Sequence, residues 1–147
     1  MNIRLTTLSL VGLLLMVGGA AGLVFTESMF SPAPAVIAAQ VAAAALMLWA
    51  RVTFGRRSFH AGAEPTAGGL VTTGPYRFIR HPIYTAVCLF TLAGVLAHRT
   101  PVAAGLALLV LAGTACRMLA EERLVVTRYP EYAEYAARTR RMVPFLF

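Results

Sequence analysis

The chain has 147 residues, the length of a single domain. Hydrophobic residues make up 59% of it and charged residues 13%, about half of the roughly 25% that soluble domains carry. Together with a mean hydropathy of +0.71, this composition excludes an ordinary soluble domain and indicates a membrane protein. The net charge of +7 does not indicate nucleic-acid binding, because the arginines lie in the connections between apolar segments.

Two apolar segments open the chain. Leu5–Phe25 has 21 residues without a charge, so it is long enough to cross a bilayer and too long for a secretory signal. Its Gly18 and Gly22 form a pair that would let another helix approach closely, although a glycine-rich helix contains this spacing by chance as well. After a break at Ser31–Pro34, Ala35–Phe54 is expected to form a second helix, whose Gln40 we expect to hydrogen-bond to a neighbouring helix.

A polar segment follows and ends in a basic, aromatic turn. We expect Gly62–Gly69 to be an irregular loop and Leu70–Tyr76 to run extended into the turn Gly74–Tyr84. Charged and aromatic residues at a membrane surface are costly unless they bind something, so this turn is a candidate functional segment.

The third and fourth apolar segments are short. Ile83–Ala97 and Val102–Cys116 have 15 residues each, or about 23 Å of helix against a bilayer core of about 30 Å. They form either a short transmembrane hairpin or a pair that uses flanking residues to complete the crossing. Their cysteines, Cys88 and Cys116, are expected to be buried apolar residues, because two cysteines at this spacing match no metal site.

The end of the chain is polar again. Arg117–Val126 should continue the fourth helix, and Glu131–Arg138 should form a short amphipathic helix with Tyr132 and Tyr135 on one face. That face would lie on the membrane or cover the site. The sequence thus predicts an all-α polytopic membrane protein with about four transmembrane helices and a short C-terminal amphipathic helix. Residues 1–147 form one domain, in which 1–54 are scaffold helices and 70–144 the functional half.

The arginines orient the chain. With four crossings, twelve of the thirteen arginines lie on one side and only Arg99 on the other. By the positive-inside rule both termini and the polar clusters face the cytoplasm, as in a bacterial inner membrane.

Two polar groups should meet at that face. His81 precedes Pro82 and is therefore expected at the cap of the third helix, beside backbone N–H groups that can hold a carboxylate. Arg117 and Glu121 are four residues apart on the fourth helix and hence close enough to pair. Antiparallel packing of these helices would place the pair beside His81 and Tyr84.

These motifs resemble one known family. The pattern combines Gly-x-Tyr at Gly74, Arg-His-Pro-x-Tyr at Arg80, Arg117 with Glu121-Glu122, Tyr-x-x-Tyr at Tyr132 and a closing Arg-x-x-Pro at Arg141. It is similar to the isoprenylcysteine carboxyl methyltransferases, which are integral membrane enzymes that use S-adenosylmethionine and have relatives that methylate phospholipid amines. The resemblance covers about Leu70–Pro144.

Carried over position by position, the resemblance implies that Arg117 orients the substrate and that Arg117 and Glu121 are the catalytic residues. It also implies a cofactor site of Leu70, Val71, Tyr76, His81, Pro82, Ile83, Tyr84 and Glu121. Three departures stand out: Ala86 replaces a frequent glycine, Tyr129–Glu131 replaces a longer Phe-Gly-Glu-Glu, and the additional amino-terminal helices of the animal enzymes have no counterpart. The last leaves the substrate open.

The acceptor has two chemical alternatives. A lipophilic carboxylate needs no base but does need a cation to orient it, which Arg117 would supply. An amine needs a proton acceptor, for which Glu121 or Glu122 is available.

The remaining polar residues have ordinary structural explanations. If Glu122 is not such an acceptor, we expect it to pair with Arg123 or Arg128. We expect His60 and His98 to be exposed loop residues. A small four-helix exporter is the alternative from another class, but the first helix lacks the acidic residue that couples protons in such proteins.

Overall fold

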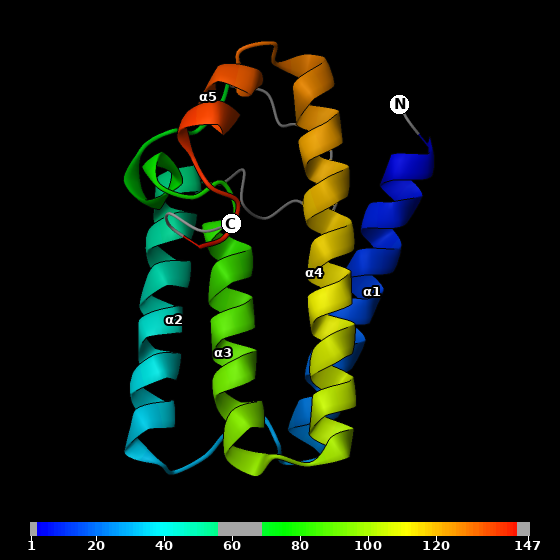
Figure 1. Ribbon diagram of the computed structural model, residues 1–147, viewed down its shortest axis with the longest axis vertical. Helices are drawn as coiled ribbons and strands as arrows, with labels where there is room; N and C mark the ends of the chain where they lie inside the picture. The colour runs from blue at the N-terminus through cyan, green and yellow to red at the C-terminus, as the bar shows by residue number, and fades with distance from the viewer. Residues whose placement is uncertain (1–2, 56–68, 144–147) are drawn as a thin grey trace.

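In the computed structural model, which describes residues 3–55 and 69–143, the chain is a bundle of long helices (Figure 1). Within these described residues its helices are α1 (Ile3–Phe25), α2 (Pro34–Phe54), the 3₁₀-helix η2 (Gly74–Arg77), α3 (Pro82–His98), α4 (Pro101–Arg128) and α5 (Tyr132–Arg138). These two ranges contain no β-strand, so the predicted all-α class is confirmed. The predicted loop up to residue 68, Arg56, Arg57, His60 and Pro144 lie outside the described residues.

Three helices are long and apolar enough to cross a membrane: α1, α2 and α4. The fourth apolar segment belongs to a helix of 28 residues, which with its flanking residues is long enough for a crossing. The third remains short, since the 17 residues of α3 make about 26 Å of helix. Large apolar side chains are exposed along these helices, among them Leu14, Trp49 and Leu108, as expected of helices that face lipid.

Proline marks the start of three helices. Pro34, Pro82 and Pro101 each occupy the first turn, where a missing N–H group leaves no hydrogen bond unmade. The Thr100 hydroxyl also accepts a hydrogen bond from the N–H of Ala103 at 3.1 Å, which caps α4. The helix ends are therefore largely encoded locally. His98 departs from the expectation of an exposed loop residue: it ends α3, is half-buried, and its Nδ1 lies 2.9 Å from the Gly94 carbonyl oxygen.

The helices pack mainly as two pairs, α1 with α4 and α2 with α3 (Figure 1). Glycines bring α1 and α4 together, but not the pair that the sequence suggested. A Cβ on Gly18 would meet no atom of the described chain within 4 Å, whereas one on Gly12 would lie 2.7 Å from the Gly113 carbonyl oxygen. Gly19 approaches the Leu106 carbonyl oxygen equally closely. The contact therefore runs through Gly12 and Gly19, with Gly22 touching only the Leu106 side chain, because the facing helix selects which glycines are covered.

This packing predicts opposite results for two alanine substitutions. In Gly113→Ala the new methyl group would lie 2.4 Å from the Gly12 carbonyl oxygen, so the helices must separate. We expect a loss of about 1–3 kcal/mol in stability. Gly18→Ala has free space around it, and its better helix propensity should leave stability unchanged or slightly higher. Thermal unfolding of both variants in the same detergent measures the difference, and equal unfolding temperatures would contradict the glycine contact.

One junction between the two helix pairs lies toward the end of the bundle remote from the charges. Buried apolar residues from α1, α3 and α4 form the core there, including Leu23, Val95 and Val110. Gln40 of α2 donates to the carbonyl oxygens of Met29 at 2.7 Å and of Phe90, on α3, at 3.3 Å. The predicted hydrogen bond from Gln40 to another helix is thus confirmed.

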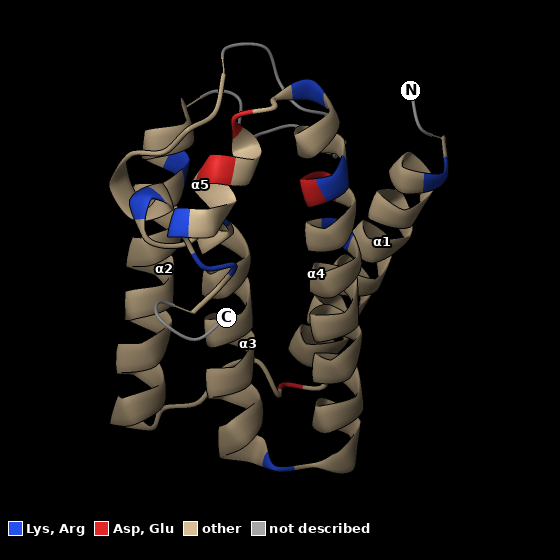
Figure 2. Cartoon of the chain, turned by 45° about the horizontal axis from the view of Figure 1, so that its top comes forward, with Lys and Arg blue, Asp and Glu red and all other residues tan. Residues whose placement is uncertain are grey.

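Charged residues gather at one end of the bundle (Figure 2). The start of α1, the end of α4, α5 and the turn before α3 share this end, while Glu27 and Arg99 lie in connections at the other. The predicted asymmetry of the arginines therefore holds for the described residues, and it points to the charged end as the place to look for a site.

Candidate active site at the charged end of the bundle

The turn before α3 is held against α2 and α5. Gly74 has φ of 56°, which favours glycine, and a Cβ there would lie 2.5 Å from the Thr53 hydroxyl oxygen of α2. The Tyr76 ring packs 5.5 Å from that of Phe54, and the Tyr135 hydroxyl donates to the Tyr76 carbonyl oxygen at 2.6 Å. Burial raises the pKa of Tyr76 above its usual range and that of Tyr135 to about 12, so both hydroxyls stay protonated at neutral pH.

Tyr84, Arg117 and Glu121, here called the Glu121 triad, join α3 to α4. Arg117 is only 6% exposed. Its Nε donates to the Tyr84 hydroxyl oxygen at 2.8 Å, and its Nη2 donates to Glu121 Oε1 at 3.2 Å. The Tyr84 hydroxyl donates to the same carboxylate oxygen. The predicted Arg117–Glu121 pair and its approach to Tyr84 are confirmed, because antiparallel packing aligns these helix ends.

Glu121 also acts on Tyr76. Its negative charge contributes, after burial, to the raised pKa of the Tyr76 hydroxyl. The turn before α3 and the Glu121 triad therefore occupy the same electrostatic neighbourhood.

Arg80, His81, Glu122 and Arg141, here called the Glu122 cluster, lie beside the triad. Glu122 Oε1 accepts from Arg80 Nε at 2.9 Å and lies 3.2 Å from His81 Nε2, while Oε2 accepts from Arg141 Nε at 3.1 Å. The expected pairing of Glu122 with Arg123 or Arg128 is wrong. Those arginines are exposed on α4, whereas Glu122 points toward segments that come from elsewhere in the chain.

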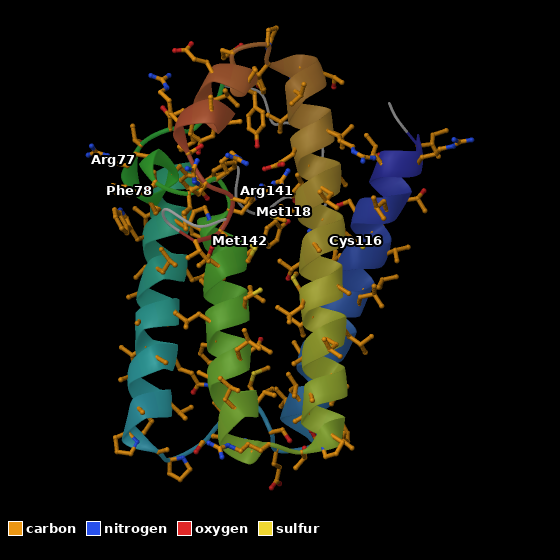
Figure 3. All side chains as sticks on the ribbon, in the orientation of Figure 1. Arg77, Phe78, Cys116, Met118, Arg141 and Met142 are labelled. Carbon is orange, nitrogen blue, oxygen red and sulfur yellow. The ribbon has the colours of Figure 1, made fainter. Side chains whose placement is uncertain are left out.

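The chain after α5 returns to the start of α3 (Figure 3). We call residues 139–143 the C-terminal strap. The N–H groups of Arg80 and His81 donate to the carbonyl oxygens of Arg140 and Arg141 at 2.7 and 2.9 Å. The Thr85 hydroxyl donates to the Met142 carbonyl oxygen at 2.8 Å. The strap thus covers the first turn of α3 with backbone hydrogen bonds.

The tyrosines of α5 face inward. Tyr132 and Tyr135 are buried, and their rings contact each other at 5.8 Å. Burial and the charge of Glu122 raise the pKa of Tyr132, which keeps it protonated. Of the two predicted roles for this face, the structure selects covering the turn rather than lying on the membrane.

The predicted site residues fall into two groups. Tyr76, His81, Pro82 and Tyr84 are buried around the start of α3, where Ile83 is half-buried. Leu70 and Val71 are half-buried in the segment that leads into η2. Their assignment to a cofactor site stays a prediction.

The cysteines stand apart from these groups. Cys88 is buried, with its sulfur 3.9 Å from the Thr114 hydroxyl, and Cys116 is half-buried. No group of three possible metal ligands occurs among residues 3–55 and 69–143.

The donors at this end fit S-adenosylmethionine, which carries a carboxylate and two positive groups. Pro82 has no N–H and that of His81 is bonded to the strap, so the donors left at the start of α3 are those of Ile83 and Tyr84. Such a helix start suits a carboxylate. Glu121 is 24% exposed and uses only Oε1 within the described chain, so Oε2 can accept from a cationic group.

Sequence comparison identifies the chain at this point. The family model of the phospholipid methyltransferases matches residues 33–132, more than half of the chain. The chain belongs to the phospholipid methyltransferase family. The match runs from α2 to the start of α5, and thus includes the turn before α3, the Glu121 triad and all of the Glu122 cluster except Arg141. The description of this family names methyl transfer as the activity of its members.

The chain is also similar to a curated protein whose name describes metal resistance. The cobalt-zinc-cadmium resistance protein CzcN of Cupriavidus metallidurans is 38% identical over 78 residues. The match covers 52% of this chain and 36% of the relative, so the chain spans about a third of that protein's length. No solved structure matches the chain.

Two connections between distant segments are not predicted by the sequence patterns. The motif contained Arg80 and Arg141 but gave them no partner, although Arg80 Nη1 donates to the carbonyl oxygens of Ala136 and Thr139 at 3.0 and 2.6 Å. Tyr135 reaches the Tyr76 carbonyl across 59 residues. The sequence signal for this contact was the hydroxyl of Tyr135, a polar group on the face of α5 that packs inward.

Proposed function

We propose that this protein is a membrane methyltransferase, which transfers a methyl group from S-adenosylmethionine to the carboxylate of a lipophilic acceptor, as in isoprenylcysteine O-methylation. The observation that carries the proposal is Arg117, a guanidinium held nine-tenths buried where an apolar helix reaches the charged end. Tyr84 and Glu121 fix its orientation. A planar donor in a fixed position can direct a carboxylate oxygen toward a methyl donor.

S-adenosylmethionine, when bound, supplies the methyl group on a sulfonium, and a carboxylate oxygen receives it without any proton leaving the acceptor. The task of the protein is then to hold two ligands in line. The backbone N–H groups of Ile83 and Tyr84 would hold the carboxylate of the cofactor, and Glu121 would hold a cationic group. Leu70, Val71, Tyr76, His81 and Pro82 would line the same site.

The membrane sets the two directions of approach. The charged end would face the cytoplasm, an orientation that the arginine distribution favours, so the cofactor would enter from water. A lipophilic acceptor would enter sideways from the bilayer, with its polar end toward Arg117. A bacterial inner membrane fits this orientation.

A second candidate acceptor is an amine, as the family name suggests. The partial exposure of Glu121 favours it, since a carboxylate that reaches solvent can take the proton that a methylated amine releases. Family membership supports either transferase over an exporter.

Incubation of the purified protein with methyl-labelled S-adenosylmethionine and a bacterial lipid extract distinguishes these acceptors. We expect lipid-soluble label that mild base releases as methanol, which indicates a methyl ester. Label that stays on a lipid headgroup through the same treatment would indicate the amine. A Glu121→Ala variant serves as the control, and lipid extracts without any enzyme-dependent label would contradict the proposed transfer.

A further inference from the structure

The two neighbouring glutamates of α4 serve different parts of the molecule. One residue of an α-helix turns by about 100°, so adjacent side chains cannot face the same partner. Glu121 faces α3 and binds within the triad, while Glu122 faces the turn before α3 and the C-terminal strap. The Glu122 side chain is also the less exposed of the two, at 13% against 24%.

Within the described chain, Glu122 is the carboxylate that joins its own helix to two other segments at once. Its Oε1 binds the turn through Arg80 and His81, and its Oε2 binds the strap through Arg141. Because the carboxylate only accepts, the His81 Nε2 beside it must carry a proton. Glu122 therefore ties both the turn before α3 and the strap to α4.

Arg80 extends this connection to α5. Its Nε binds Glu122, and its Nη1 binds the carbonyl oxygens of Ala136 and Thr139 at the end of α5. Cations placed on the last carbonyl groups of a helix satisfy acceptors that have no partner within it. Without Glu122, Arg80 would lose the charge that fixes its position, and α5 and the strap would lose a common support.

We propose that Glu122 is a positioning residue: it holds the C-terminal strap and His81 on the first turn of α3 and so shapes the cofactor site without touching the cofactor. This inference rests on the proposed function for the meaning of that site. Glu121 is left to contact the ligand. In this proposal Glu122 holds the site together, and Glu121 binds the ligand within it.

Glu122→Gln tests the proposal with little change in shape. Glutamine has one accepting oxygen and one donating amide, so its amide group must face either the Arg80–His81 side or Arg141. Hydrogen exchange followed by mass spectrometry should show the amides of Arg80, His81 and Arg140 exchanging about tenfold faster or more, since their bonds join the turn and strap. Exchange in α1 and in the first half of α4 should not change.

Two matched variants serve as controls. Glu134→Gln removes an equivalent carboxylate whose pair with Arg138 is exposed, at 74% and 71%, and should leave all exchange rates unchanged. Glu121→Gln should weaken ligand binding and leave the strap protected. Faster exchange of the strap in Glu121→Gln to the same extent would overturn the division between the two glutamates.

Kinetics provide the second readout. Glu122→Gln should raise the KM for S-adenosylmethionine about tenfold and change kcat by less than about threefold at saturation, because a displaced site binds less but reacts normally once filled. Unchanged strap exchange, or faster exchange throughout α1 and α4, overturns the proposal. Absence of methyl transfer in the unaltered protein contradicts the proposed function alone, since the exchange experiment does not depend on activity.

Discussion

Replacing Glu121 by alanine is expected to abolish measurable binding of S-adenosylhomocysteine while the helix content stays the same. The carboxylate would provide a charge-assisted hydrogen bond to the ligand, which is worth about 1.5–3 kcal/mol, or up to about a hundredfold in Kd. Glu121 also holds Arg117 and Tyr84, so its removal disturbs the walls of the site as well. Isothermal titration calorimetry in detergent measures the loss.

The control separates binding from folding. Glu134→Ala removes an exposed carboxylate from α5 and should keep the affinity of the unaltered protein. Circular dichroism should give the same helix content for all three proteins. Unchanged calorimetric binding in Glu121→Ala, with the fold intact, would show that the cofactor site has been assigned to the wrong residue.

Replacing Arg117 by alanine should have the converse effect: binding of S-adenosylhomocysteine is retained and turnover falls about a hundredfold or more. The Tyr84 hydroxyl still donates to Glu121 in this variant, so the cofactor side of the triad survives. What is lost is the cation that would align the acceptor, and a misplacement of about 1 Å costs roughly a hundredfold in rate. Label transfer under saturating cofactor measures the loss.

A lysine at this position sharpens the test. Arg117→Lys keeps the positive charge and loses the planar guanidinium that Tyr84 and Glu121 hold in place, so only part of the turnover should return. If Arg117→Ala still turns over at the original rate, then the arginine only joins α3 to α4 and the acceptor is oriented elsewhere.

Both predictions assign the two ligands to different members of the triad. Arg117 is buried, whereas Glu121, four residues further along α4, is partly exposed. The Tyr84 hydroxyl lies between them and bonds to each. This order suits a reaction in which a polar cofactor and a lipophilic acceptor approach one point from opposite environments.

Much of the fold follows from local properties of the sequence. Proline positions and uncharged length predicted all four long helices to within a few residues at most ends, because these signals act within one turn. The Arg117–Glu121 pair followed from helix periodicity alone. The motif around His81 indicated the family, which the match to residues 33–132 confirmed.

Contacts between distant segments could not be predicted from local signals. Which glycines lie between α1 and α4 depends on how each helix is rotated about its axis, and the spacing of small residues does not predict that rotation. The partners of Glu122 were mispredicted for the same reason. Neighbours on its own helix were the visible choices, whereas Arg80 and Arg141 lie 42 residues before it and 19 residues after it.

The sequence by itself determined that this is a helical membrane protein with its charges at one end, because length, hydropathy and helical period are properties of single segments. Only the tertiary structure decided which acid of the Glu121–Glu122 pair faces α3 and which holds the strap. That choice depends on the segment after α5 folding back over the first turn of α3, and no period or spacing in the sequence predicts this contact.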